Sequence, residues 1–218
     1  MRGMRRKNKL EYKFTVEGQT ECQYLNWLQN TINNCQDKFT VKISVQVDLY
    51  TTAEIKSMSS FSSMTITHLC DIEGKEEMYK KRFQKIIDQL ANINRLGKNI
   101  EYQLGYSNLS FELWMILHKC NYAKSVVNCN AYLDEINKCF NKKFESLNKY
   151  KREENFKQCL DQLNINDVCT AIKRSKQLMK EKIDKKVEYK KFEYYENNPS
   201  LTIWEQIEKI IKDCEVSC

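Results

Sequence analysis

The alternation of strand-like and helix-like segments over the first 118 residues is the feature that most constrains the fold. Four segments are either alternately apolar and polar or continuously apolar and β-branched, the patterns of strands: 10–16, 41–49, 64–70 and 100–104. Apolar residues recur every three or four positions between and after them, the spacing of helices, in 19–34, in 76–94 and in a segment with Phe111, Trp114, Met115 and His118. This order predicts an α/β protein with a mainly parallel sheet flanked by helices.

The rest of the chain has a different pattern. Residues 51–63 suit a short helix or a loop, and Gly105–Asn108 suits a turn. Beyond residue 120 the strand pattern disappears, and helices are expected at 130–140, 153–163 and 164–183, followed by an ambiguous segment at 187–198 and a last helix that opens on a capping box of Thr202 and Glu205. We therefore expect an α/β core over 1–120 and a helical region over 121–218 that packs on it.

Length and composition limit the class of protein. The 218 residues, 41% hydrophobic and 30% charged, suit one soluble domain with a helical appendage. The chain has no run of about 18 apolar residues and no apolar stretch behind its first charges, so neither a membrane span nor a secretory signal is expected, and the cytoplasm is the expected location. Its ten cysteines form no CxxC pair and only two histidines accompany them, which disfavours zinc and predicts mostly reduced thiols in the core.

The net charge of +7 is unevenly distributed, with basic clusters at 2–9, 138–152 and 173–191. Basic surfaces attract polyanions, and nucleic acid is the commonest such partner in a cell. Tyrosine and phenylalanine side chains interleave with these lysines and can stack on unpaired bases: Tyr150, Tyr189, Phe192 and Tyr194. The alternatives are a solvated lysine-rich surface or a helical cap that binds a protein partner.

Carboxylates follow two of the predicted strands. Glu17 ends the first, with Glu21 four residues on in the first turn of the next helix, and Asp71 and Glu73 follow the strand at 64–70. Alone, Glu17 suits a turn, Glu21 a helix start and Asp71 a cap. Together, at neighbouring strand ends of a parallel sheet, they predict a site for Mg²⁺ or Mn²⁺, because hard oxygen ligands select these ions and two such ions commonly serve phosphodiester hydrolysis.

Further candidates lie near the fourth strand. Ser107 and Asn108 end it and are expected to bind substrate, unless one of them caps the next helix, and Glu112 near the start of that helix is expected to point back at the metal. Lys75, just after the acidic pair, and Lys124, after the next helix, are candidate phosphate-binding cations, and nothing in the spacing selects one of them; Lys75 is included among the expected substrate-binding residues. Of the histidines, His118 is expected to be buried or to support the site from behind, and His68 to be structural.

Two phrases give the chain a family resemblance. A strand followed by EGxxE, and later a strand followed by an acidic pair, resembles the TOPRIM domain of topoisomerases, primases and overcoming-lysogenization-defect nucleases. YSNLSFELWMILH at 106–118 resembles the SNPxFELWLLLH signature of RloB-like proteins, with Leu109 in place of the usual proline, and Asn198-Pro199-Ser200 with Thr202 matches the ending of that family. The acidic pair is DxE here, where DxD is commoner.

The resemblance implies a Rossmann-like TOPRIM core in an effector of bacterial anti-phage or abortive-infection loci, such as AbiL, encoded beside an ATPase of the ABC or structural-maintenance type. It implies a metal-dependent nuclease, with RNA or tRNA favoured over DNA. Glu17 would act as general acid/base or metal ligand, Glu21 as a second ligand, and Asp71 and Glu73 as the acidic pair. The alternatives are a non-catalytic nucleotide or nucleic-acid sensor or adaptor of the ATPase, and nucleotidyl transfer of the primase kind.

Overall fold

Four parallel strands and one short antiparallel strand form the central sheet. The computed structural model describes residues 7–58 and 63–218. The order across the sheet is β2-β1-β3-β4-β7, formed by β1 (Asn8–Val16), β2 (Phe39–Val47), β3 (Met64–Asp71), β4 (Ile100–Asn108) and β7 (Ser200–Leu201). β7 pairs antiparallel with the end of β4. The predicted α/β class and its mainly parallel sheet are confirmed.

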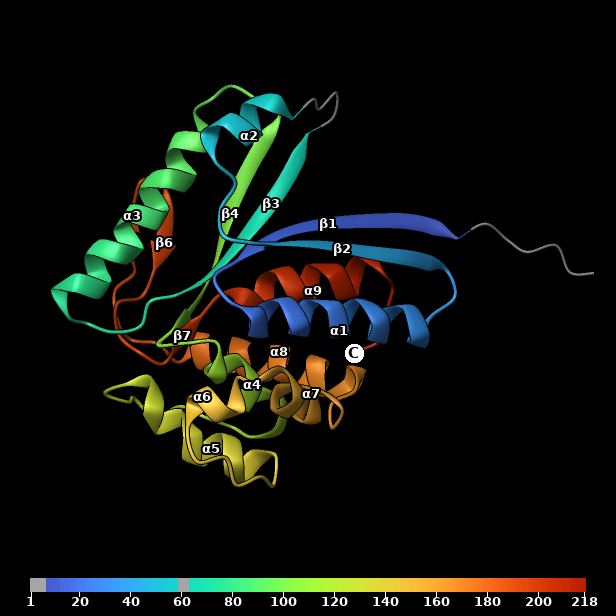
Figure 1. Ribbon diagram of the computed structural model, residues 1–218, viewed down its shortest axis with the longest axis vertical. Coiled ribbons are helices and arrows are strands. Elements are labelled where there is room, and N and C mark those ends of the chain that lie inside the picture. The colour runs from blue at the N-terminus through green and yellow to red at the C-terminus, as the bar shows by residue number, and fades with distance from the viewer. Residues whose placement is uncertain (1–6, 59–62) are drawn as a thin grey trace, which may run out of the picture.

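The two faces of the sheet are covered by different elements. α3 (Glu77–Asn94) packs on one face with α2 (Thr52–Ser57) and with a hairpin of β5 (Val187–Tyr189) and β6 (Phe192–Tyr194) (Figure 1). Their cluster includes Phe83 and Tyr102. α1 (Gln19–Cys35) covers the other face together with the C-terminal helices. Apolar residues on both faces explain why β3 is nearly all apolar or β-branched, as in other buried parallel strands.

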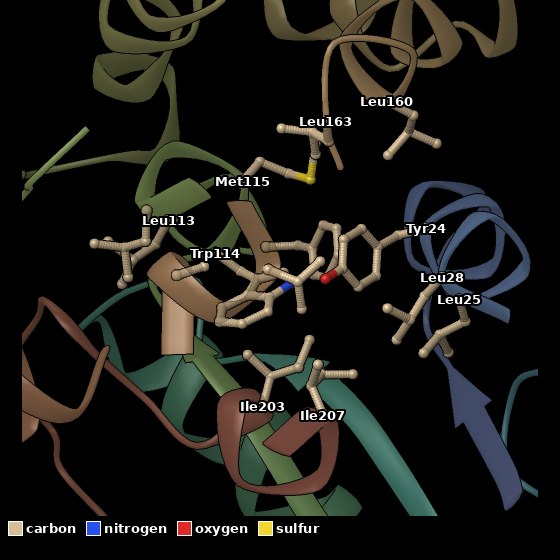
Figure 2. Packing of buried hydrophobic residues seen from close by; sticks show 14 of the residues in the cluster. Tyr24, Leu25, Leu28, Leu113, Trp114, Met115, Leu160, Leu163, Ile203 and Ile207 are labelled. Carbon is tan, nitrogen blue, oxygen red and sulfur yellow. The ribbon is translucent and has the colours of Figure 1, made fainter. Parts of the chain in front are cut away.

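The C-terminal helices are centred on one buried helix, α4. The set comprises α4 (Glu112–Lys119), the 3₁₀ turn η1 (Cys129–Ala131), α5 (Tyr132–Cys139), α6 (Leu147–Tyr150), α7 (Glu153–Leu160), α8 (Ile165–Lys180) and α9 (Ile203–Asp213). Leu113 to Leu117 of α4 are all buried, as expected for a helix that is apolar on every side. Trp114 packs among Tyr24 of α1 and Ile203 and Ile207 of α9 (Figure 2). One hydrophobic cluster therefore joins the predicted core and the predicted helical region.

The sheet is held together at its centre over only a short stretch. β1 pairs with β2 over nine residues and β3 with β4 over eight, but β1 pairs with β3 only from Lys13–Val16 to Ile66–Leu69. The amino-terminal halves of β1 and β3 therefore separate, and the two strand pairs run in clearly different directions (Figure 1). The carboxyl ends of these strands are the ends that stay close together.

The predicted turn at 105–108 is wrong, because β4 continues through Asn108. Gly105 indicates close packing within the strand: a Cβ built there would lie 2.6 Å from Cδ2 of Leu69, a residue that is 2% exposed. Glycine therefore lets β4 lie against the Leu69 side chain of β3, a use of strand glycines that sequence alone does not separate from a turn.

Two expectations for the C-terminal part are also wrong. Strands do occur beyond residue 120, since the ambiguous segment contains the β5–β6 hairpin and β7 extends the sheet. Thr202 does not use its side chain to cap α9; its Oγ1 accepts a hydrogen bond from the Tyr106 backbone N–H at 3.1 Å. Docking of this segment on β4 takes the hydroxyl away from the helix, so the local capping pattern is overridden by tertiary pairing.

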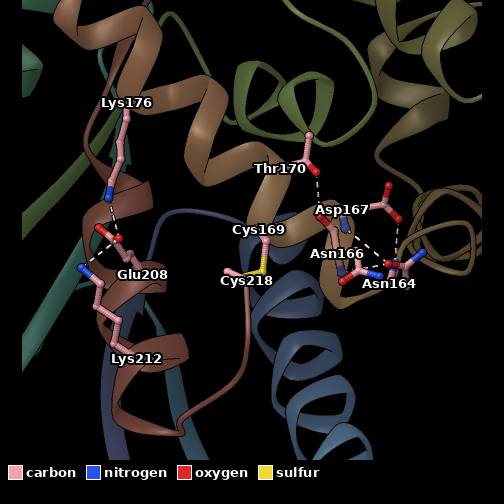
Figure 3. The surroundings of a disulfide bond; sticks show 9 residues. All are labelled: Asn164, Asn166, Asp167, Cys169, Thr170, Lys176, Glu208, Lys212 and Cys218. Carbon is pink, nitrogen blue, oxygen red and sulfur yellow. Dashed lines mark hydrogen bonds and ion pairs between the residues drawn. A yellow bond between two sulfur atoms is a disulfide. The ribbon is translucent and has the colours of Figure 1, made fainter.

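The cysteines differ in part from the prediction. Cys120 pairs with Cys139, and Cys169 of α8 pairs with the C-terminal Cys218 (Figure 3). Six others are free thiols. The chain around Cys218 is thus held against α8, close to the ion pair of Lys176 with Glu208 of α9 at 2.5 Å. The expectation that most cysteines are unpaired holds, but not for these four.

Candidate active site

The predicted carboxylates lie at the carboxyl edge of the sheet. Glu17 directly follows β1, and its Oε2 accepts a hydrogen bond from the Asp71 backbone N–H at 2.9 Å. Asp71 is the last residue of β3 and lies opposite Ser107 of β4 in the parallel register. The ends of β1, β3 and β4 therefore meet, as expected for neighbouring strands joined near their carboxyl ends.

Glu17 and Glu73 share one cation, Arg82 of α3. The Arg82 guanidinium donates to Oε1 of Glu17 at 3.1 Å and also pairs with Glu73. Burial raises the pKa of Glu17, opposed by the Asp71 N–H and by Arg82. Glu73 has a left-handed backbone, with φ of 65°, and its N–H donates to the Leu109 carbonyl at 2.8 Å. One guanidinium thus partly compensates the charge of two carboxylates.

A second group of carboxylates is more deeply buried. Glu21 is 7% exposed in the first turn of α1 and accepts a hydrogen bond from Thr20 Oγ1 at 3.0 Å. Glu112 is 1% exposed as the first residue of α4 and accepts from Ser110 Oγ at 2.6 Å. Its other oxygen lies 3.1 Å from Nζ of Lys151. Glu112 is thus the closest partner of the cation in this group.

Electrostatics ties these groups together. Burial raises the pKa of Asp71 well above its ordinary value, and the charges of Glu21 and Glu112 raise it further. Burial and Glu112 also raise the pKa of Glu21. Burial alone would lower the pKa of Lys151, but Glu112, Asp71 and Glu21 outweigh it and raise that pKa. Three carboxylates therefore repel one another around a single ammonium group.

Gly18 lets the Glu21 carboxylate lie against the backbone at the start of α1. A Cβ at Gly18 would lie 3.0 Å from Oε2 of Glu21, tighter than most real contacts. The backbone of Gly18 is extended, so its value here is space and not a special conformation. The predicted EGxxE pattern thus has a geometric meaning: the glycine leaves room for the second glutamate.

Arg82 and Lys151 are the two site residues that the sequence analysis missed. Arg82 lies in the middle of α3, and Lys151 follows α6 within the basic cluster 138–152. Neither has a local pattern that separates it from the many other lysines and arginines. Only the packing of α3 and of the C-terminal helices brings them to the carboxyl edge.

The predicted substrate-binding residues lie in different environments. Ser107 is buried, and its carbonyl accepts from the Ile72 N–H at 3.0 Å. Asn108 is also buried, and its side-chain amide donates to the carbonyls of Tyr195 and Glu196, both at 3.1 Å, so it anchors the C-terminal segment. Neither side chain caps α4. Lys75 is exposed and has no ion-pair partner among the described residues.

Both histidines are buried. His118 hydrogen-bonds through Nδ1 with the Trp114 carbonyl and through Nε2 with Tyr24 Oη, at 2.9 and 3.1 Å. His68 Nδ1 lies 2.9 Å from Thr15 Oγ1. Burial lowers the pKa of each histidine to about 4, so both are neutral at physiological pH.

The oxygen ligands at this site are of the type that a hard divalent cation prefers, but their present positions do not form a complete ligand set. The negative charges of Asp71, Glu21 and Glu112 repel one another, and a bound Mg²⁺ or Mn²⁺ would offset that repulsion. Over residues 7–58 and 63–218, however, no three acidic, histidine or cysteine side chains converge so that they could hold one ion. Mg²⁺ usually takes one or two carboxylates together with water and substrate phosphate, so a complete set of protein ligands is not required.

Fold and site together define an α/β protein with a buried acidic cluster at the carboxyl edge of a parallel sheet. A family model described as RloB-like protein matches residues 14–210, so the chain belongs to the RloB-like family. The resemblance read from the FELW phrase is thereby confirmed. No curated protein and no solved structure gave a significant match. In the part of the chain that the structure describes, no helix has both the length and the apolar character needed to cross a membrane.

Proposed function

We propose that this protein is a metal-dependent nuclease of the TOPRIM kind that hydrolyses phosphodiester bonds at the cluster of Asp71, Glu21 and Glu112. The observation that carries the proposal is that buried Glu21 and Glu112 gather with the half-buried Asp71 and the cation of Lys151 at the carboxyl edge of the sheet. Buried like charges destabilise a fold, so their presence at the edge where α/β proteins bind ligands favours a chemical role.

Each residue of the cluster has a separate part in this proposal. Asp71 and Glu21 hold Mg²⁺ or Mn²⁺, with Glu17 and Glu73 as further candidate ligands once Arg82 moves away. The bound ion would lower the pKa of a water molecule and neutralise charge on the phosphate. Lys151 binds a phosphate oxygen electrostatically, and Glu112 holds its ammonium group in place. Glu17, whose pKa is raised by burial, takes up or gives a proton.

The substrate and biological setting are part of the same proposal. RNA, and tRNA in particular, is favoured because related TOPRIM effectors in ATPase-paired defence systems cut tRNA. Membership of the RloB-like family supports a role as effector of an anti-phage system with an ABC or structural-maintenance ATPase as partner. The net charge of +7 is consistent with a nucleic-acid partner.

The test is an incubation of purified protein with total RNA and with plasmid DNA, in Mg²⁺, Mn²⁺ or EDTA. We expect cleavage of RNA in the metal-containing samples and none in EDTA. Asp71→Asn and Lys151→Met should each reduce the cleavage rate at least about 100-fold, the order of effect of removing one preorganised charged group. Glu77→Gln is the matched control, because Glu77 is an exposed acid on α3 that pairs only with Lys81 among the described residues.

One feature favours a second candidate, a non-catalytic sensor or adaptor that binds a nucleotide or nucleic acid. Arg82 and Lys151 lie at the site and pair with Glu17, Glu73 and Glu112, so two cations that can contact a phosphate are present without any metal. Binding of RNA that persists in EDTA, with no cleavage in any metal and no loss in Asp71→Asn, would favour this role and defeat the nuclease proposal. Host toxicity of the same variant gives an independent readout.

A further inference from the structure

A cavity of about 940 Å³ lies along the outer edge of β4, away from the carboxylates. It extends from Tyr106 toward Glu101, which is the direction of the amino end of the strand. Its other walls come from α3, from the β5–β6 hairpin, from the C-terminal end of α8 and from the N-terminal end of α9 (Figure 1). We refer to this cavity as the β4 groove.

Aromatic rings line the β4 groove. Phe192, Tyr195 and Trp204 are partly exposed in its wall, and two of these rings already attract lysines. Nζ of Lys176 lies 5.5 Å from the Trp204 ring centre, and Nζ of Lys182 lies 5.5 Å from that of Tyr195. Exposed aromatic faces of this kind stack on nucleobases, because every base has a π-face.

The groove also carries an excess of positive charge. Five of its lining residues are cations, Arg95, Lys180, Lys186, Lys190 and Lys191, against three glutamates, Glu101, Glu193 and Glu205. Lys186 pairs with Glu193 at 2.8 Å, and Lys190 lies 3.9 Å from Asp88. The other three cations have no ion pair with any residue the structure describes. Uncompensated cations beside aromatic rings favour an anionic ligand with a flat apolar part.

Two of these lysines are held in an unfavourable backbone conformation. Lys190 and Lys191 form the two-residue turn of the β5–β6 hairpin, with φ of 52° and 72°. A hairpin turn of this type strongly prefers Asn-Gly, because both central residues adopt positive φ. Two lysines in this position have a backbone cost that the turn itself does not require, and such outliers concentrate at functional sites.

The open edge of β4 supplies hydrogen-bonding groups. Asn94 bonds both backbone groups of Tyr102 at 2.7 and 3.1 Å, and Thr202 does the same for Tyr106 at 3.1 and 2.9 Å. Leu104 lies midway between Tyr102 and Tyr106, so by strand alternation its N–H and C=O point to the same side as theirs, away from β3. Neither group has a hydrogen-bond partner among the described residues. A donor and an acceptor two atoms apart match the edge of a nucleobase.

From these features we infer that the β4 groove binds a nucleoside phosphate, as a free nucleotide or as one unit of a single strand. The base stacks on the aromatic wall and its edge bonds the Leu104 backbone, while the hairpin lysines bind the phosphate. This site is separate from the carboxylate cluster, and the inference does not rest on the proposed nuclease activity. It also gives the interleaved aromatic and basic residues at 187–194 a common purpose.

The experiment is calorimetric titration of the full chain in EDTA and low salt with four probes: ATP, adenosine, tripolyphosphate and a five-residue oligoadenylate RNA. EDTA removes any contribution of metal at the carboxylates. ATP or the oligonucleotide should bind at least tenfold more tightly than adenosine or tripolyphosphate, because only these probes carry both parts. Tighter binding of ATP assigns a free nucleotide, and tighter binding of the oligonucleotide assigns a strand. Binding of neither, or equally tight binding of tripolyphosphate, overturns the inference.

The decisive variant is Lys190→Asn/Lys191→Gly, which gives the hairpin its preferred turn residues. It should fold at least as stably as the natural chain in a thermal melt, yet bind the better probe at least tenfold more weakly. Lys143→Asn/Lys157→Asn removes the same charge from exposed lysines elsewhere and should change affinity less than twofold. An equal loss in both variants would reduce the effect to nonspecific attraction and refute the site. Asp71→Asn should leave binding unchanged, whatever its effect on cleavage.

Discussion

Replacing Lys151 with methionine tests whether one cation holds the buried carboxylates together. Methionine keeps most of the apolar stem of lysine and removes its charge. Glu112 would then remain 1% exposed with Ser110 as its one hydrogen-bond partner, beside Asp71 and Glu21. We expect a loss of stability at neutral pH that comes mainly from charge and very little from packing.

The size of that loss follows from the geometry of the pair. Two unit charges 3.1 Å apart attract by about 5 kcal/mol at an effective dielectric constant of about 20. The Lys151 side chain is 39% exposed, so solvent screens part of this attraction. About half remains after this discount, and we expect the free energy of unfolding to fall by about 2–3 kcal/mol, near the lower end for a broken buried ion pair.

The loss should depend on pH in a defined direction. Burial and neighbouring charges already raise the pKa of Asp71 and Glu21 in the folded protein. A carboxyl group with a raised folded pKa binds its proton more tightly in the folded state, so protonation favours folding, and this contribution disappears as pH rises through the folded pKa. Without Lys151 these pKa values rise further. The deficit of the variant should therefore be largest near pH 8 and shrink toward pH 5.

The assay is urea unfolding followed by circular dichroism at pH 5, 7 and 8, with Lys157→Met as control. Lys157 is an exposed lysine of α7 with no ion pair to any described residue, and its replacement should stay within about 0.5 kcal/mol at every pH. Adding Glu112→Gln to the Lys151 variant should recover most of the loss. A deficit equal at all three pH values would indicate lost packing, and one below about 0.5 kcal/mol would show that the cation is not needed; either result refutes the reasoning.

Three further changes test other parts of the structure. Gly18→Ala should displace the Glu21 carboxylate, because its Cβ would lie 3.0 Å from Oε2, and we expect at least tenfold slower RNA cleavage with a change in stability below about 1 kcal/mol, measured by cleavage and thermal melting together. Gly105→Ala should destabilise the fold by about 1–3 kcal/mol in urea, because its Cβ would overlap the buried Leu69 side chain. Cys218→Ser opens a link across 49 residues and should cost up to about 4 kcal/mol in oxidising buffer, with no effect once dithiothreitol is present.

The elements that the sequence predicts best are those with a long, regular pattern. The strands β1, β2 and β3 and the helices α1 and α3 are predicted within about two residues, because their buried faces produce a regular apolar periodicity, whereas β4 extends four residues beyond its predicted end. The errors fall where a single local signal has two physical causes. Gly105 suggests a turn in the sequence, but in the structure it allows close packing within β4. Thr202 and Glu205 suggest a capping box, but the Thr202 hydroxyl accepts a hydrogen bond from the β4 backbone instead.

The site was predictable in part for the same reason. Glu17, Glu21 and Asp71 follow strands or begin a helix, so their meeting at one edge follows from parallel topology alone. In the structure the carboxylates form two groups. Glu17 and Glu73 pair with Arg82, whereas Asp71 and Glu21 interact with the charges of Glu112 and Lys151. Which carboxylate meets which cation depends on side-chain packing between distant elements, and periodicity contains no information about it.

The short pairing between β1 and β3 connects the fold to the proposed chemistry. Because these strands pair only from Lys13–Val16 to Ile66–Leu69, they are joined to each other at their carboxyl ends, and Glu17 adds a further link by accepting a hydrogen bond from the Asp71 backbone N–H. Rigid strand ends hold carboxylates close in spite of their repulsion. Lys151, by contrast, directly follows α6 and reaches the cluster through the packing of the C-terminal helices on one another and on α1. The carboxylates and Lys151 therefore belong to different parts of the chain, and we expect a change that loosens the C-terminal helices to remove the cation from the proposed site without disturbing the sheet.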